Sequence, residues 1–238
     1  MRMRRHIRER MTHQEQVSEA LILSLFLAFS GGLQDAYTYM IRDHVFANGQ
    51  TGNVVLMSAG FMEGNWKMGL RYLIPVLAFA AGIFLAEIIG TRYKWARLLH
   101  WRQGILLMEI GLMIGVGLLS REYNLLANCM VSFACALQVQ TFRKVCGHAY
   151  ASTMCIGNLR SGTEALSVYL RHRKKEDKDR AGYYFSVIAV FAVGAGTGGL
   201  LSGYFQEKTI WISCVILVLC FLLMELDRLE QEARDYKE

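Results

Sequence analysis

The sequence predicts an all-α integral membrane protein with six transmembrane helices arranged as two inverted repeats. Three observations support this fold class. Apolar residues make up 53% of the 238 residues, they gather in long blocks, and a pattern in the first half of the chain returns in the second. Long apolar blocks are typical of membrane-spanning helices rather than of amphipathic helices in soluble proteins. The whole chain, residues 1–238, is therefore expected to form a single membrane domain.

Six stretches are each about long enough to cross a hydrocarbon core of roughly 30 Å as a helix. They are residues 17–41, 72–91, 104–120, 123–142, 183–205 and 209–226. The first follows an arginine-rich segment and could pass for a signal peptide. It continues through Ile41 and further spans follow, so we interpret it as a retained helix.

Two segments, 45–62 and 147–170, are too polar to be complete spans. If both enter the membrane and return to the same side, six crossings remain. Most Lys and Arg residues then lie on the side of the N-terminus, as the positive-inside tendency requires. If both segments cross, the basic loop at 92–102 falls outside. The charge pattern favours six spans with both termini in the cytoplasm, whereas the choice between re-entrant and crossing segments stays open.

A repeat links the two halves of the chain. Residues 29–47 (FSGGLQDAYTYMIRDHVFA) align without a gap to residues 133–151 (FACALQVQTFRKVCGHAYA). The matches are Phe29/Phe133, Leu33/Leu137, Gln34/Gln138, His44/His148 and Ala47/Ala151, and one inserted residue then aligns Gly52-Asn53 with Gly157-Asn158. Phe79-Ala80-x-Gly82 also recurs as Phe191-Ala192-x-Gly194.

The repeat predicts the organisation of the membrane domain. Repeat one covers about 17–120 and repeat two about 123–226, with cytoplasmic tails at 1–16 and 227–238. An odd number of crossings separates the two copies, so the second is inverted relative to the first. Inverted repeats with broken helices are a recurrent architecture of secondary transporters.

Asp35 is the first functional candidate. It lies about two thirds of the way along the first span, where an ionised carboxylate is costly unless it faces protein, water or a cation. It would couple transport to a proton or cation; alternatively, it pairs with Arg42 or caps the re-entrant helix. Its counterpart in the repeat is Val139. The matched Gln34 and Gln138 either line a site or form hydrogen bonds between helices.

The segment Thr51-Gly52-Asn53 suits the start of a half-helix, because Thr can cap it and its exposed N–H groups attract an anion. The alternative is a capped connection without a ligand. Asn158 is the matching polar residue of the second half. The candidate substrate-binding residues are therefore Gln34, Asp35, Thr51, Gly52, Asn53, Gln138 and Asn158.

Other residues have structural interpretations. Glu87 and Glu109 are expected near the cytoplasmic interface, paired with Arg92 or Arg102. The glycines between 194 and 203 indicate close helix packing, within the chain or in a homodimer. The six cysteines are expected to be small buried thiols.

The sequence also bears on the class of function. It contains no Ser/His/Asp set, no metal-ligand spacing and no phosphate-binding lysine, so we expect no catalytic residues, metal or cofactor. Basic residues lie in short loops without interleaved aromatics, which argues against nucleic acid as a partner. The expected partners are membrane lipids and an unidentified small solute. The predicted function is secondary transport; the alternative is a non-transporting scaffold or lipid-binding module.

The stretch GLQDAYTYMIRDHVFANGQTGNVV resembles the YoaK-type family of small polytopic bacterial membrane proteins, a domain-of-unknown-function family. The positions that carry the resemblance are Gly32, Asp35, Ala36, Phe46, Thr51, Gly52 and Asn53. The second half departs from the motif, with Ile156-Gly157-Asn158 where Thr-Gly-Asn would be expected. The resemblance implies a multi-pass protein of the bacterial cytoplasmic membrane with a permease role, and it implies no substrate.

Overall fold

The computed structural model describes residues 21–92 and 101–235. Its α-helices are α2 (Leu21–Ile41), α3 (Gln50–Met62), α4 (Trp66–Arg92), α5 (Trp101–Leu118), α6 (Asn124–Thr141), α7 (Cys155–His172), α8 (Lys175–Phe205) and α9 (Trp211–Asp235). Two short 3-10 turns, η2 (Arg121–Tyr123) and η3 (Gln206–Ile210), precede α6 and α9. The predicted helical class is confirmed. A two-stranded antiparallel hairpin, β1 (Lys144–Val145) with β2 (His148–Ala149), is an addition that the sequence did not predict.

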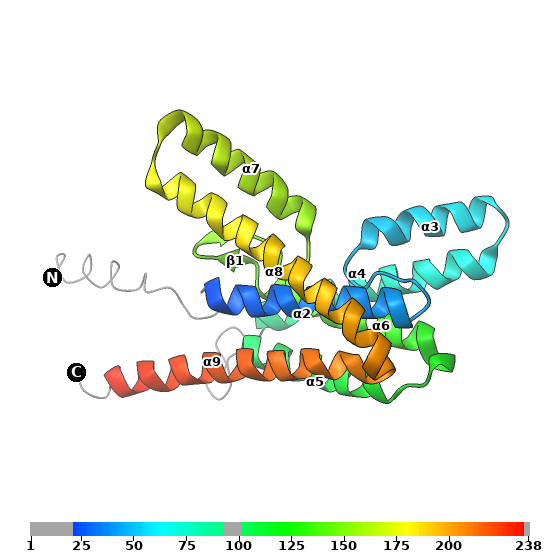
Figure 1. Ribbon diagram of the computed structural model, residues 1–238. Coiled ribbons are helices and arrows are strands. Elements are labelled where there is room, and N and C mark those ends of the chain that lie inside the picture. The colour runs from blue at the N-terminus through cyan, green and yellow to red at the C-terminus, as the bar shows by residue number, and fades with distance from the viewer. Residues whose placement is uncertain (1–20, 93–100, 236–238) are drawn as a thin grey trace.

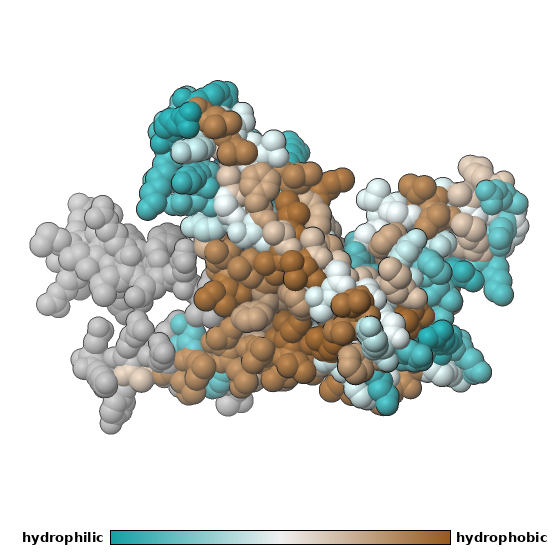
Figure 2. Space-filling view, viewed as in Figure 1, coloured by the Kyte–Doolittle hydropathy of each residue, from teal (hydrophilic) through white to brown (hydrophobic). Residues whose placement is uncertain are grey.

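Within the described residues, three helical stretches are long and apolar enough to cross a membrane, judged by length and composition. They are Trp66–Arg92, Trp101–Leu118 and Lys175–Leu229, the last of which joins α8 and α9 through η3. Large apolar side chains are exposed along them, among them Phe84, Leu200 and Val215. Figure 2 shows an apolar surface across the middle of the molecule and polar surface toward the tips of its hairpins. Exposed apolar surface on this scale supports a membrane protein.

Each of the six predicted spans contains one helix, and the main differences lie at the ends. α8 begins at Lys175, eight residues before the apolar block, because the charged run there still favours a helix and places Glu176 and Asp177 in the first turn. α9 continues beyond the predicted span, which ends at 226, into the charged C-terminal segment as far as Asp235. The predicted tail at 1–16 and the start of the first span lie outside the described residues.

The helices form a bundle with two projecting hairpins. α3 and the first part of α4 make one hairpin, and α7 and the first part of α8 make the other (Figure 1). Inside the bundle, α2 packs against α8 and α9, while α6 packs against α4 and α5. Fully buried apolar side chains from α2, α5, α6 and α9 fill the centre, for example Leu27, Met113, Val131 and Leu217.

Helices α2 and α8 meet backbone to backbone. A Cβ added to Gly32 would lie 2.1 Å from the carbonyl oxygen of Phe191, and one added to Gly194 would lie 2.2 Å from that of Phe29. The close packing predicted for the glycine-rich stretch is thus confirmed at Gly194, and it occurs within the chain. Gly196 meets nothing within 4 Å.

The same kind of contact joins α4 to α6. A Cβ on Gly82 would lie 2.5 Å from the carbonyl oxygen of Phe133. Gly82 aligns with Gly194 in the sequence, and Phe133 aligns with Phe29. Aligned residues of the two halves therefore make equivalent contacts, each glycine resting on the phenylalanine carbonyl of the opposite half.

Candidate functional site

The first helical turns of α3 and α7 face a common cavity of about 590 Å³. Its lining consists of one α2 carboxylate, the two segments that lead into α3 and α7, and one α8 ring: Asp35, Phe46, Asn48, Gly49, Gln50, Thr51, Gly52, Thr153, Met154, Cys155, Ile156, Gly157 and Phe191. Three of the predicted site residues, Asp35, Thr51 and Gly52, lie together here.

Two asparagines hold the chain where it turns into α3 and α7. Asn53 accepts a hydrogen bond from the Phe46 N–H (3.1 Å) and donates one to the Phe46 carbonyl (2.6 Å). Asn158 does the same with Ala151, at 3.3 and 2.7 Å. Both side chains are buried. They fix the entry of each helix and do not line the cavity.

The electrostatic character of the cavity follows from these helix starts. The N-terminal end of a helix carries a partial positive charge and attracts anionic groups. Neither N-cap residue, Gly49 for α3 or Met154 for α7, supplies a side-chain cap. Thr51 lies in the first turn rather than at the N-cap, so the expected capping by Thr51 is wrong. Two positive helix ends and one carboxylate therefore face the same space.

Asp35 holds the segment that precedes α3. Its Oδ1 accepts a hydrogen bond from the Asn48 N–H at 2.8 Å. Of the two structural alternatives for this residue, the pairing with Arg42 is not found. The expected capping of the re-entrant helix has a near equivalent, because the bonded N–H belongs to Asn48, one residue before the N-cap Gly49. Asp35 remains partly exposed to the cavity, so its carboxylate can also meet a ligand.

Arg42 has a different role, which the sequence did not reveal. Its side chain is fully buried, and all five of its N–H groups donate hydrogen bonds at the C-terminal end of α5. The acceptors are the Tyr37 hydroxyl (2.9 Å), the carbonyls of Val116 (2.9 Å), Leu119 (2.8 Å) and Ser120 (3.1 Å), and Asn124 Oδ1 (3.1 Å). Arg42 thus satisfies the terminal carbonyls that a helix leaves without partners.

Gln34 and Gln138 lie inside the bundle, away from the cavity lining. Gln34 Nε2 donates to Ser213 Oγ of α9 at 2.8 Å and to Ser30 Oγ at 3.1 Å. Gln138 Nε2 donates to Ser152 Oγ at 2.8 Å and to the Leu27 carbonyl of α2 at 3.3 Å. The geometry favours the second of the two predicted roles, hydrogen bonding between elements.

Most of the bundle matches a known protein family. Residues 23–223 match the family described as "Protein of unknown function (DUF1275)". The chain belongs to this family. No curated protein and no solved structure matches it. The match supports the resemblance to an uncharacterised family of small membrane proteins and does not extend to the YoaK-type label.

Glu109 of this DUF1275 chain corrects one sequence prediction. We expected it at an interface beside Arg102; it is fully buried instead, and its partner is Gln34. α5 begins at Trp101, so Glu109 lies more than two turns inside the helix. Glu87 remains exposed near the end of α4 and accepts a hydrogen bond from Gln140 at 2.5 Å. Sequence position alone could not separate these two glutamates, because the burial of Glu109 depends on which face of α5 packs against α6 and α9.

Proposed function

We propose that this DUF1275 protein is a secondary transporter of a small solute across the bacterial cytoplasmic membrane. Its architecture would be six spans in two inverted repeats, with re-entrant segments at α3 and α7 and with both termini in the cytoplasm. The observation that carries the proposal is the cavity at which two helix N-termini and Asp35 meet. Transporters built from inverted repeats bind their substrates at such broken helices.

The contacts between the halves support the inverted repeats. α2 packs on α8 as α6 packs on α4, with Gly194 and Gly82 at equivalent places. Asn53 and Asn158 hold their helices by the same pair of hydrogen bonds. Such an exchange of equivalent contacts is what a two-fold relationship between the halves produces.

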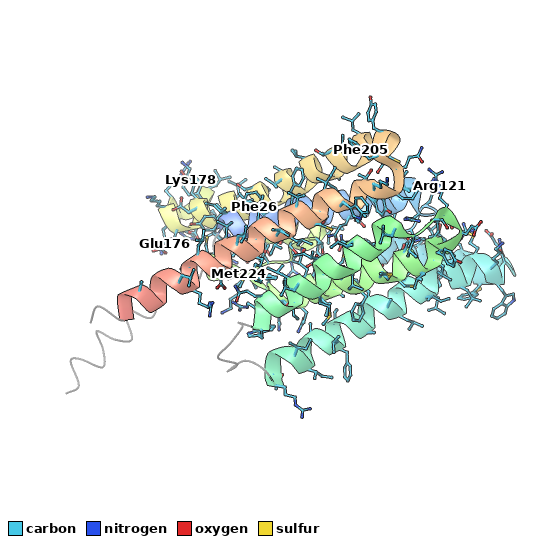
Figure 3. All side chains as sticks on the ribbon, turned by 90° about the horizontal axis from the view of Figure 1, so that it is seen from below. Phe26, Arg121, Glu176, Lys178, Phe205 and Met224 are labelled. Atoms are coloured by element: carbon cyan, nitrogen blue, oxygen red, sulfur yellow. The ribbon has the colours of Figure 1, made fainter. Side chains whose placement is uncertain are left out.

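The ends of the bundle support the proposed orientation. Figure 3 shows Arg121 and Phe205 at one end, and Glu176 and Lys178 at the other. The second end carries the basic run at 171–180, which cytoplasmic loops favour. In this orientation α3 is reached from outside and α7 from the cytoplasm.

Within the proposal, Asp35 couples solute movement to a proton or cation, and Thr51 and Gly52 present the end of α3 to the solute. Non-helical backbone at membrane depth must line a wet cavity or be buried in protein. The segments before α3 and α7 would meet this requirement through Asn53 and Asn158. Gln34 and Gln138 would keep the helices of the two halves in register.

Reaction of single cysteines with a charged, water-soluble thiol reagent tests for the wet cavity. A variant that retains only Cys155, which lines the cavity, should react in membranes. The matched control retains only Cys220, which is fully buried, and should stay unmodified. Thr51→Cys on a background without the six native cysteines should react as well. Protection of both Cys155 and Thr51→Cys would contradict the wet cavity.

Replacement of Asp35 tests the coupling. Asp35→Asn keeps an oxygen that can accept the Asn48 N–H, so the fold should survive. A thermal-shift screen of purified wild-type protein would identify a stabilising solute, because a ligand that binds the folded state raises the melting temperature. Uptake of that solute into proteoliposomes should depend on pH in the wild type and lose this dependence in Asp35→Asn. An unchanged pH dependence would contradict the coupling role.

A lipid-binding module is the second candidate, and one observation favours it. An apolar groove of about 450 Å³ lies between α2, α8 and α9, lined by Ile22, Leu25, Phe26, Phe29, Val190 and Ile216. A lipid acyl chain suits such a lining. Stabilisation by lipids alone, with Cys155 protected from the water-soluble reagent, would favour this candidate over transport.

A further inference from the structure

A polar cluster lies in the interior of the bundle where α2, α5, α6 and α9 meet. Gln34 of α2 is at its centre. Its Nε2 donates to Ser213 of α9 and to Ser30, and it lies 3.5 Å from Glu109 Oε1 of α5. Its Oε1 accepts a hydrogen bond from Cys135 Sγ of α6 at 2.8 Å. The hydroxyls of Ser30 and Ser213 also contact each other.

Glu109 is the carboxylic acid of the cluster and is poorly partnered. Its side chain is fully buried, and its Oε2 has no hydrogen-bond partner among residues 21–92 and 101–235. The hydrogen bond that its Oε1 accepts from Gln34 is at the long limit for such a bond. An ionised carboxylate in such a place would lose its hydration without compensation, which is strongly unfavourable. A neutral carboxylic acid avoids most of this cost.

The groups that face Glu109 do not supply a positive charge. The thiols of Cys135 on α6 and of Cys214 and Cys220 on α9 are close enough to Glu109 to interact with it electrostatically. The elements packed around it contribute the amide of Gln34 and the hydroxyls of Ser30 and Ser213. In the part of the chain that the structure describes, no Lys, Arg or His forms an ion pair or hydrogen bond with Glu109.

We infer that Glu109 is an internal proton-binding site, held by Gln34 at the junction of the four helices. This site is separate from the cavity and from the coupling role proposed for Asp35. It would exist whether or not a solute is carried.

α2 connects the site to the cavity. Gln34 and Asp35 are neighbours in the chain; the carboxylate of Asp35 lines the cavity and the amide of Gln34 contacts Glu109. A rotation or shift of α2 that changes the cavity therefore also changes Gln34, the one hydrogen-bond partner of Glu109 among the described residues. Through this contact, a ligand in the cavity can change how strongly Glu109 holds its proton.

Infrared spectroscopy of the purified protein tests the inference without a known solute. A protonated carboxyl group has a C=O stretching band that the carboxylate lacks. We expect this band in the wild type at neutral pH, its loss in Glu109→Gln and its persistence in Asp35→Asn. Gln34→Leu should keep the band but shift its frequency, because the carbonyl loses its hydrogen-bond donor. Identical spectra in this region for the wild type and Glu109→Gln would overturn the inference.

A second variant covers the case in which Glu109→Gln does not fold. Glu109→Asp retains a carboxyl group at a slightly different position, so its band should remain at an altered frequency. A band unaffected by both Glu109→Asp and Gln34→Leu would assign the proton elsewhere and overturn the inference. Neither result depends on transport. If the wild type shows the Glu109 band but takes up no solute, the proposed function is contradicted and the inference about Glu109 is not.

Discussion

Asn53 and Asn158 make the same pair of hydrogen bonds in the two halves of the chain. Each binds both the N–H and the carbonyl of the residue seven positions earlier, Phe46 in one case and Ala151 in the other. Each thereby fixes the chain just before a helix that begins at the cavity. In the sequence alignment, one residue is inserted between Ala47/Ala151 and these asparagines. Phe46 therefore aligns with Tyr150 and not with Ala151, yet each asparagine bonds the residue seven positions before it.

Removal of either asparagine should destabilise the protein by a similar amount. Asn53→Ala removes both side-chain bonds to Phe46, and Asn158→Ala removes both bonds to Ala151, whose carbonyl still accepts the Met154 N–H at 3.4 Å. These backbone groups are part-buried, and a buried group that loses its partner costs about 1–3 kcal/mol. Unfolding in mixed detergent measures the effect. Thr197→Ala is the control, because this exposed hydroxyl bonds only to the Val193 carbonyl of its own helix. A large loss in one asparagine variant and none in the other would contradict the structural equivalence.

The two glycine contacts should also respond alike. Gly82→Ala and Gly194→Ala place a methyl group against backbone that cannot give way, and overpacking of this kind costs about 1–3 kcal/mol. Gly196→Ala is the matched control in the same helix as Gly194, with nothing within 4 Å of the added carbon. It should be neutral or stabilising by up to about 1 kcal/mol, since Ala is the better helix former. Melting temperatures of the three variants in one detergent test this prediction. Equal melting temperatures for Gly194→Ala and Gly196→Ala would contradict it.

Arg42 should not tolerate lysine. An ammonium group can donate three hydrogen bonds, whereas the guanidinium of Arg42 makes five in a fixed fork. With bonds to charged groups contributing about 1.5–3 kcal/mol each, Arg42→Lys should lower the free energy of unfolding by roughly 3 kcal/mol or more. Arg121→Lys, at an exposed ion pair with Glu207, should change it by less than about 1 kcal/mol. Comparable effects of the two substitutions would refute the capping role of Arg42.

The ion pair of Arg121 and Glu207 should contribute a small acid-sensitive part of stability. Arg121 Nε donates to Glu207 Oε1 at 2.7 Å, and this bond lowers the pKa of Glu207 below its ordinary value of 4.5. The stabilisation is present above pH 4.5 and is lost as the pH falls through the pKa of the folded state. The melting temperatures of wild type and Arg121→Gln should therefore differ at neutral pH and converge in acid. A constant difference over this range would show that the pair does not act through the charge of Glu207.

Much of the helical framework could be predicted from the sequence. Apolar length located α2, α4, α5, α6, α8 and α9, since a membrane span needs about 20 apolar residues in a row. It did not locate α7, which is as long as α5 and α6 but more polar. The alignment of the halves located the equivalent glycines and asparagines before their contacts were known. Asp35, Thr51 and Gly52 were among the seven candidate substrate-binding residues, and the structure places these three around one cavity.

The polar interior could not be predicted in the same way. The sequence pattern gives the depth of a residue along a helix but not the neighbour that it faces. Glu109 was therefore expected at the cytoplasmic interface, and Arg42 was considered only as a partner of Asp35. The partners that bury them come from distant helices: Gln34 for Glu109, and the end of α5 for Arg42. Polar residues in apolar segments often bind a ligand, so four of them were candidates for substrate binding: Asn53, Asn158, Gln34 and Gln138. In the structure their hydrogen bonds go to the protein itself.

The unequal charge of the two halves has a thermodynamic consequence. Asp35 and Arg42 align with Val139 and Cys146, so the halves agree in backbone contacts and differ in ionisable groups. If the halves exchange roles during transport, the two mirrored states are equal in shape but unequal in free energy. One of the two conformations would then be favoured at rest. The proton concentrations on the two sides of the membrane would set the fraction of molecules in the other conformation.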